Sequence, residues 1–336
     1  LTLSPEFSAG AKIVNSKTFA FVDNGAMVNE NDAGAVAAQD VAIVAGSDTH
    51  MMGIAGSANV AGFAIGAAVD ASLVNNQTKA FIDTGASVEA RRDVRVEAHA
   101  VEDVLSISGA IGGGLGGGIA GSVPLVSIQS VTEAYISGTV EAEGSVLVKA
   151  VNDTDADAVA GSFVISVAAI FGEGGLTVGA SVGVIQITKD TSAYIASGAT
   201  VNADADAPTS VQVYDGTIDE TTDAFNTETI QGVAVQAASS EVVTNLTGSG
   251  GAGGGGLSIA GAVAFNFVDS DTQAFVGNAD VNTAMGAEAD QAVNISAVNV
   301  TRVAGVSFNV QGNVSAITGG LDFGDIQNST TASIRA

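Results

Sequence analysis

The amino-acid sequence predicts an all-β fold, a repetitive β-solenoid of stacked long strands, and three observations carry that prediction. A short motif recurs along the chain, and a segment in which apolar and polar residues alternate follows most of its copies. The chain also contains 43 glycines, which would make long helices costly. An antiparallel meander of long β-hairpins fits the same observations and stays open as the alternative.

The recurring motif, here called the anchor, reads Thr, any residue, Ala, an aromatic residue, then Ile or Val. Five copies begin at Thr18, Thr78, Thr132, Thr191 and Thr272, and a weaker sixth begins at Thr330. Their spacings are 60, 54, 59, 81 and 58 residues. A repeat of this size is typical of arrays in which each unit buries its apolar face against its neighbours. We therefore expect the anchors to be buried.

Strand-like segments with a common pattern delimit the repeats. They cover residues 41–44, 94–97, 146–149, 211–214 and 293–296. On this pattern residues 1–336 form a single repeat array, with a partial repeat at 1–40 and repeats at about 41–93, 94–145, 146–210, 211–290 and 291–336. The longest interval contains an acidic insertion, 215–231, predicted to follow the 211–214 strand as a loop. No capping unit is recognisable, so we expect a window of a longer array.

The composition limits the classes of partner. The formal net charge is -26, which disfavours nucleic acid and anionic membrane surfaces and attracts divalent cations. There is no cysteine, so disulfides and cysteine chemistry are excluded. The longest nearly unbroken apolar run, 158–171, is shorter than the roughly 20 residues of a membrane helix, so no transmembrane segment is predicted. No signal peptide is visible.

Two groups of acidic residues are candidate metal ligands. Asp153, Asp155 and Asp157 alternate, so their carboxylates would share one face of a strand. Within the insertion the candidates are Asp215, Asp219 and Asp223. Calcium takes six to eight oxygen ligands and is the one cofactor that these residues suggest, although neither an EF-hand nor a calcium-binding nonapeptide is present. The alternative is a solvated acidic face.

Catalytic sites find no support, and we predict that the chain is not an enzyme. The glycine runs 112–117 and 251–256 match a dinucleotide fingerprint only formally, because strands lie on both sides of them. Tight bends or close sheet packing explain such glycines equally well. The two histidines, His50 and His99, would make too few ligands for a metal site even if they stacked in adjacent coils.

Taken together, the anchor, the turns such as 85–88, the alternating strands and the tracts 120–122 and 160–162 resemble repeats of very large bacterial exoproteins. The families in question are the filamentous-haemagglutinin-like adhesins and the leukotoxin-type giant surface proteins. The resemblance implies an extracellular or cell-surface location and a structural, adhesive scaffold that forms fibres. Its alternatives are the passenger region of a secreted cytotoxin and a calcium- or polysaccharide-binding module. The expected partners are further copies end to end, neighbouring repeats of a longer chain, and host or cell-surface glycans.

Overall fold

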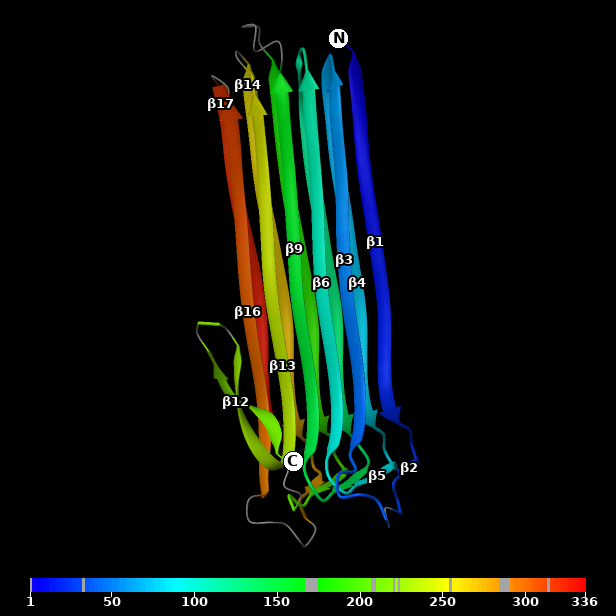
Figure 1. Cartoon of the computed structure of the whole chain (residues 1–336). Coiled ribbons are helices and arrows are strands. Elements are labelled where there is room, and N and C mark those ends of the chain that lie inside the picture. The colour runs from blue at the N-terminus through cyan, green and yellow to red at the C-terminus, as the bar shows by residue number, and fades with distance from the viewer. Residues whose placement is uncertain are drawn as a thin grey trace.

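Each repeat forms one wide coil of a parallel β-solenoid in the computed structural model of the chain (Figure 1). The structure describes residues 2–31, 34–166, 175–206, 210–219, 221–222, 224–253, 256–283, 291–312 and 315–336. These residues form strands, turns and connecting segments, and among them no helix is long and apolar enough to cross a membrane. The predicted all-β solenoid is confirmed, and the antiparallel meander is wrong because all the long strands within a sheet run parallel.

Every complete coil contributes one strand to each of three sheets. Sheet A contains β1 (Leu3–Val22), β4 (Phe63–Ile82), β7 (Gly117–Ile136), β10 (Leu176–Ile195), β14 (Leu257–Val276) and β17 (Ser315–Ile334). The short sheet B contains β2 (Met27–Val28), β5 (Ser87–Ala90), β8 (Thr139–Ala142), β11 (Thr200–Ala203) and β15 (Asp280–Val281). Sheet C contains β3 (Val41–Ala61), β6 (Val94–Gly114), β9 (Val146–Ser166), β13 (Phe225–Ala252) and β16 (Gln291–Gly312).

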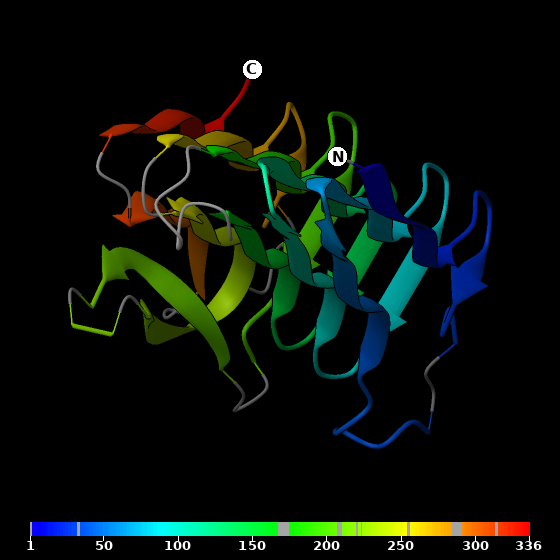
Figure 2. The same cartoon turned by 90° about the horizontal axis from the view of Figure 1, so that it is seen from above.

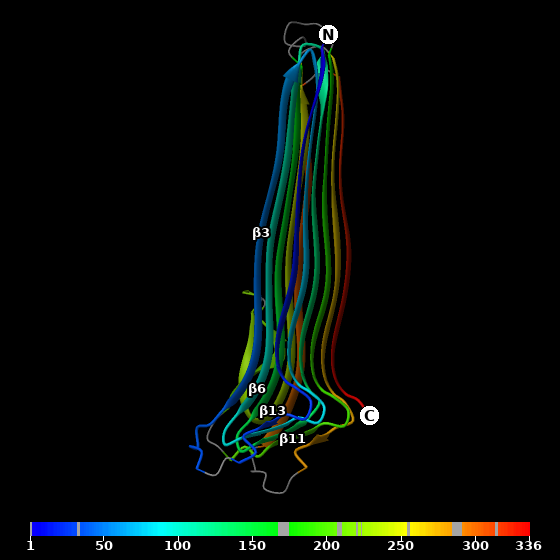
Figure 3. The same ribbon diagram turned by 90° about the vertical axis from the view of Figure 1, so that its right-hand side faces the viewer.

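Sheets A and C are long and lie face to face, and their strands run in opposite directions (Figures 1 and 2). Sheet B closes one end of the coils, which we call the proximal end, and the two long sheets diverge towards it (Figure 3). At the other, distal end the chain passes from sheet C into sheet A, and the connections from β3 to β4 and from β6 to β7 are tight turns. At one such turn a Cβ on Gly114 would lie 2.5 Å from the backbone oxygen of Gly117, whose own φ is +115°. Gly114 and Gly117 of the run 112–117 are therefore required by a sharp bend.

Strict in-and-out alternation along the long strands builds the core. In β4, for example, the inward side chains of Thr78, Ala80 and Ile82 have no exposed surface. The largest hydrophobic cluster fills the triangular space where the three sheets meet, and it consists of Val, Ile and Ala from every coil. Small side chains suit this narrow interior, and each fully buried Val or Ile contributes roughly 1.5–3 kcal/mol to stability.

Two expectations need correction. The aromatic residue of the anchor is not buried: because side chains alternate, inward Thr, Ala and Ile require the residue between Ala and Ile to point outward.

The position of the insertion is the second correction. Residues 211–214 do form a strand, but this strand is not the one that corresponds to the sheet C strands of the other repeats. Strand β12 (Val211–Ile218) pairs antiparallel with the start of β13, and Val233 lies level with Val146 instead. The extra residues therefore precede the sheet C strand rather than follow it.

Candidate functional site

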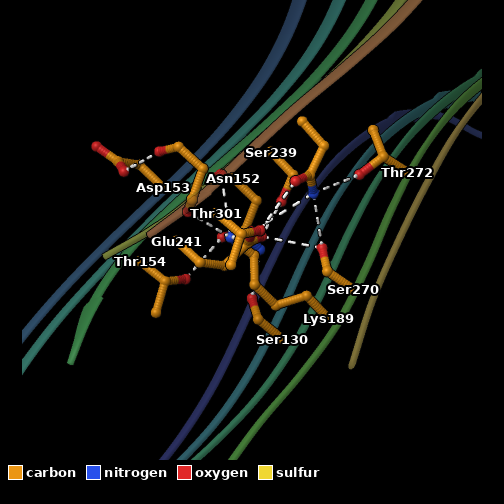
Figure 4. Close-up of polar contacts among 12 residues, drawn as sticks. Ser130, Asn152, Asp153, Thr154, Lys189, Ser239, Glu241, Ser270, Thr272 and Thr301 are labelled. Carbon is orange, nitrogen blue, oxygen red and sulfur yellow. Dashed lines mark hydrogen bonds and ion pairs between the residues drawn. The ribbon is translucent and has the colours of Figure 1, made fainter. Parts of the chain in front are cut away.

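A layer of polar side chains crosses the interior between sheets A and C, between two hydrophobic clusters (Figure 4). Successive coils place its members in register, so the layer runs along the solenoid axis as a seam of hydrogen bonds. The members at its centre are Asn76, Glu102, Ser130, Asn152, Thr154, Lys189, Ser239, Glu241, Ser270, Asn299 and Thr301.

Glu102 is the carboxylate of the first half of this seam. It is fully buried and accepts hydrogen bonds from Asn76 Nδ2 at 2.6 Å, Ser130 Oγ at 2.7 Å and Thr154 Oγ1 at 3.0 Å. The donors come from three different coils, so one side chain ties β4, β6, β7 and β9 together. Such charge-assisted bonds compensate the cost of burying a carboxylate.

Glu241 is the second buried carboxylate, and it is paired with Lys189. The Lys189 Nζ lies 3.0 Å from the Glu241 Oε1, and neither side chain has exposed surface. Lys189 also donates to the backbone oxygens of Asn152 and Ser240, at 3.2 and 2.9 Å. Glu241 accepts further bonds from Ser239, Ser270 and Thr301 at 2.5–2.9 Å (Figure 4).

The pKa values of this pair follow from enclosure and proximity. Burial lowers the pKa of Lys189, and the Glu241 charge opposes that effect without cancelling it. For Glu241 burial acts to raise the pKa, but the Lys189 ammonium and the hydrogen bonds to the carboxylate outweigh it, so the pKa lies below its ordinary value. Since solvent cannot reach these groups, the seam offers no substrate site. The seam favours the observed alignment of neighbouring coils, because a coil shifted along its neighbour would bury an unpaired charge.

The three alternating aspartates lie on the outer face of β9. Asp153 and Asp155 are exposed and Asp157 is half-buried, and Asp103 of β6 stands beside Asp155 in the register. Burial and the charges of Asp157, Asp103 and Asp153 raise the pKa of Asp155. Within the described part of the chain, no group of three or more carboxylates or imidazoles is placed to hold a metal ion.

The candidates in the insertion lie on a different element, the β12–β13 hairpin. Asp215 accepts bonds from the backbone N and the Oγ1 of Thr217, both at 2.7 Å. Asp219 accepts from the backbone N of Thr221 at 2.8 Å, and this bond is the main cause that lowers the pKa of Asp219. Both carboxylates thus stabilise their own turns. Asp223 lies outside the described residues.

The histidines do not stack. His50 faces Asp103 across β3 and β6, whereas His99 lies level with Gly46, four residues away along β3. The Nδ1 of His50 lies 3.1 Å from Asp103 and its Nε2 lies 3.0 Å from Asp48. The hydrogen bond to Asp103, followed by the charge of Asp48, raises the pKa of His50. His50 therefore belongs to the acidic surface of sheet C.

The β12–β13 hairpin covers part of the outer face of sheet C near its proximal end (Figures 1 and 2). Its apolar residues Val211 and Val213 bury Leu147 and Ala234, which would otherwise face solvent. The Nζ of Lys149 lies 4.6 Å from the centre of the Tyr214 ring, a cation–π contact. The described residues of the insertion therefore belong to a packed hairpin rather than to a simple loop.

The aromatic residues of the anchors form a ladder on the outer face of sheet A. The rings of Phe21, Phe81, Tyr135, Tyr194 and Phe275 stack face to face, with centroids 4.8–5.1 Å apart. Tyr194 donates its hydroxyl proton to Glu133 at 2.6 Å, and Arg335 lies 3.7 Å over Phe275. Because each inner ring covers the faces of its neighbours, the ladder leaves mainly ring edges to solvent.

The distal outer faces are apolar, a feature that the sequence analysis missed. On sheet C a column of glycines, Gly56, Gly109, Gly161 and Gly248, runs across four strands. On either side stand ridges of larger residues: Ile54, Ile107, Val159, Leu246 and Val306 on one side, and Ala58, Ile111, Phe163 and Val310 on the other. The glycines and the second ridge, with Val159, Leu246, Phe308 and Glu6, line a groove of about 910 Å³. The sequence does signal this feature through a lack of charged residues, because the stretches 104–132 and 242–268 contain none.

These features define the chain as a parallel β-solenoid repeat protein with a polar seam inside and an apolar distal half outside. Comparison with known proteins adds no closer identification, because no protein-family model, no curated protein and no solved structure matches the chain.

Proposed function

We propose that this chain is a structural scaffold segment of a secreted or cell-surface bacterial repeat protein, built to extend by the addition of coils. The observation that carries the proposal is the state of the terminal strands. Strand β17 has a neighbour on one side only, and its inward Ile326 is 48% exposed. The equivalent Val268, one coil earlier, is 2% exposed.

The same holds at the opposite end of the solenoid. Strand β1 pairs with β4 alone, and β3 is the last strand of sheet C on that side. Unpaired edges of this length are templates for further strands. A second copy, or a neighbouring repeat, would continue all three sheets and cover the inward side chains. The net charge of -26 keeps such an array soluble and supports an exposed location.

The experiment is a concentration series followed by negative-stain electron microscopy and sedimentation velocity. We expect filaments of constant width whose length grows with concentration. Ile326→Lys places a charge on the inward face of the edge, where coil addition would bury it, and should shift assembly to at least tenfold higher concentration. Gln327→Lys is the matched control, because this position faces outward and stays solvated in a filament. Compact, monodisperse particles at every concentration would sink the proposal.

The adhesive part of the proposal is assigned to the β12–β13 hairpin, since among the described strands this hairpin projects from the side of the otherwise regular sheets in Figure 1. Replacing residues 204–232 with the three-residue turn 143–145 of the preceding coil restores a regular coil. Retention on host glycans should then be lost while the circular dichroism spectrum of the solenoid remains. Equal retention of both proteins would remove the hairpin as the adhesive element.

A further inference from the structure

Three of the four glycines in the column on the outer face of sheet C are not required by the fold, whereas a Cβ on the fourth, Gly248, would meet the ring of Phe308 on β16. A Cβ placed on Gly56 or Gly109 would come no closer than 3.9 Å to another heavy atom, and one on Gly161 would meet nothing within 4 Å. None of the three has a positive φ. Glycine inside a strand costs roughly 0.5–1 kcal/mol of stability relative to alanine. Its recurrence at one register position therefore points to close approach from outside.

The inward glycines behave differently and serve as an internal comparison. A Cβ on Gly112 would lie 3.3 Å from the backbone oxygen of Ile119, and one on Gly118 would lie 2.7 Å from that of Ala64. The position of Gly112 is closed by the opposite sheet, and that of Gly118 is closed by the neighbouring strand β4 and by Val164 of the opposite sheet, 3.4 Å away. The outward column is open at Gly56, Gly109 and Gly161 and is closed at Gly248 by the Phe308 ring. Its ridges are exposed to solvent at Ile54 (63%) and Ile111 (52%).

We infer that the distal face of sheet C is a lateral docking surface for the same face of a second copy of this chain. A ridge of each copy, the one that contains Ile107, lies in the glycine groove of the other. Parallel columns at the strand spacing of about 4.8 Å make ridge and groove continuous across β3, β6 and β9, as in packed sheets whose side chains interdigitate, and Phe308 closes the groove beyond β13. This interface concerns the sides of the solenoid, so it goes beyond the end-to-end growth proposed above.

Charge decides the relative orientation of the two copies. The acidic side chains of sheet C, including Asp48, Asp103, Asp153 and Asp155, lie on its proximal half, whereas residues 51–69 and 104–132 around the distal turns carry no charge. Among the described residues that line the groove, Glu6 of β1 is the charged one. If the strands cross the interface antiparallel, the distal halves overlap and the two acidic halves point away from each other. A parallel arrangement would bring these like charges together, which costs energy.

The area is adequate for a specific complex. The apolar face spans about nine residues of five strands, which is roughly 30 Å by 24 Å, or about 700 Å² from each copy, at 3.3 Å per residue and 4.8 Å per strand. Standard interfaces bury about 800 Å² per partner. A lipid surface would also cover an apolar face, but the unpaired edges of β3 and β16 would then lie in hydrocarbon, which open strand edges avoid.

The test fills the groove without disturbing the fold. In the Ile326→Lys background, at concentrations below those at which this variant grows end to end, sedimentation equilibrium should show a monomer–dimer equilibrium. The double variant Gly109→Val and Gly161→Val should raise the dissociation constant at least tenfold, with an unchanged or higher melting temperature. Gly46→Val is the matched control: this glycine is also outward on β3 and meets nothing within 4 Å, but it lies outside the groove. It should leave the dimer intact.

The chain contains no cysteine, so a second measurement can locate the contact directly. Mixing Ile107→Cys protein with Gly109→Cys protein should give a disulfide-linked heterodimer under mild oxidation, whereas Ser127→Cys on sheet A should give none. Several results would overturn the inference: dimers that persist after the groove is filled, a marked fall in melting temperature on the glycine substitutions, or a monomer that floats with phosphatidylcholine vesicles. Filament growth of the unmodified chain would be unaffected by any of these, so the two proposals fail separately.

Discussion

The Nζ of Lys189 lies 3.0 Å from the Oε1 of Glu241, and both side chains are completely enclosed between sheets A and C. An ion pair without solvent is costly to form and more costly to break, because removal of one partner leaves a buried charge uncompensated. The pair joins β10 to β13 and therefore disfavours any shift of these two strands relative to each other.

A double-mutant cycle at this pair measures that coupling. Lys189→Met should lower the free energy of unfolding by about 3–5 kcal/mol, since the Glu241 carboxylate loses its cation. The double variant Lys189→Met and Glu241→Gln should lose less than Lys189→Met alone, because no charge remains buried. Urea unfolding followed by circular dichroism gives the free energy of unfolding of the wild type, of the two single variants Lys189→Met and Glu241→Gln, and of the double variant. A double variant as unstable as the sum of the singles would mean that the pair is not coupled.

Acid should weaken the fold through Glu241. Its pKa in the folded protein lies below the ordinary value of 4.5, so its contribution to stability is complete above that value and is lost as the pH falls through the folded pKa. The urea midpoint should accordingly drop more steeply below pH 4.5 in the wild type than in Glu241→Gln. Glu228→Gln, in the exposed part of the hairpin, provides the control. Identical acid profiles for all three proteins would contradict this reading.

His50 should titrate above its ordinary pKa of 6.5, because Asp103 and Asp48 favour the imidazolium. Proton NMR of a His99→Gln variant isolates the His50 resonance. Asp103→Asn should move its midpoint down, and more than Asp48→Asn does, since the bond to Asp103 is the larger cause. The small stabilisation from this site is complete below about pH 6.5 and disappears as the pH rises through the folded pKa. A midpoint unaffected by either substitution would exclude these contacts.

The aromatic ladder should stabilise the stack of coils. Tyr135→Ala removes two stacking contacts, those with Phe81 and Tyr194, and each is worth about 0.5–1.5 kcal/mol beyond area burial. Tyr135→Phe keeps the ring and should be nearly neutral. Thermal unfolding compares the three proteins. Equal melting temperatures for the alanine and phenylalanine variants would show that stacking contributes nothing.

Calcium binding is predicted to be weak or absent at the aspartates singled out in the sequence. Asp215 and Asp219 use their oxygens on their own turns, and Asp155 is flanked by aspartates on one flat face rather than in a loop that converges on an ion. Isothermal titration calorimetry with calcium should give no saturable heat, with magnesium as the control for general charge screening. A saturable signal that Asp155→Asn abolishes would establish a site on sheet C.

Much of the fold was accessible from the pattern of residues. The spacing of the anchors and the alternation around them predicted the coil, because a parallel stack places equivalent residues level with one another: Thr78, Thr132 and Thr191 do lie in register. The position of the insertion was misread because 211–214 and 233–235 alternate in the same way. The two segments differ in their pairing: 211–214 pairs antiparallel with the start of β13, whereas 233–235 pairs parallel with β9. The local sequence does not show whether a strand has a parallel or an antiparallel partner.

The site features were less accessible, for a related reason. Glu102, Lys189 and Glu241 read as ordinary surface charges, since a strand with period-2 alternation does not say which face is inside. The aromatic residues of the anchor suggested a core and instead stack outside, because their neighbours occupy the inward positions. Conversely, the outer glycines resembled the bend glycines in sequence, and only their open surroundings tell the two apart.

By itself, the sequence determined that the chain forms β-strands, that it repeats, and that each repeat adds one unit of nearly constant size. Local residue preferences and periodicity are sufficient for these properties. Only the tertiary structure decided which face of each strand points inward, which charges are enclosed as a pair, and which apolar columns remain uncovered. Those outcomes depend on how sheets A and C meet, and contacts such as those of Asn76 with Glu102 and of Lys189 with Glu241, between residues far apart in the sequence, establish that arrangement.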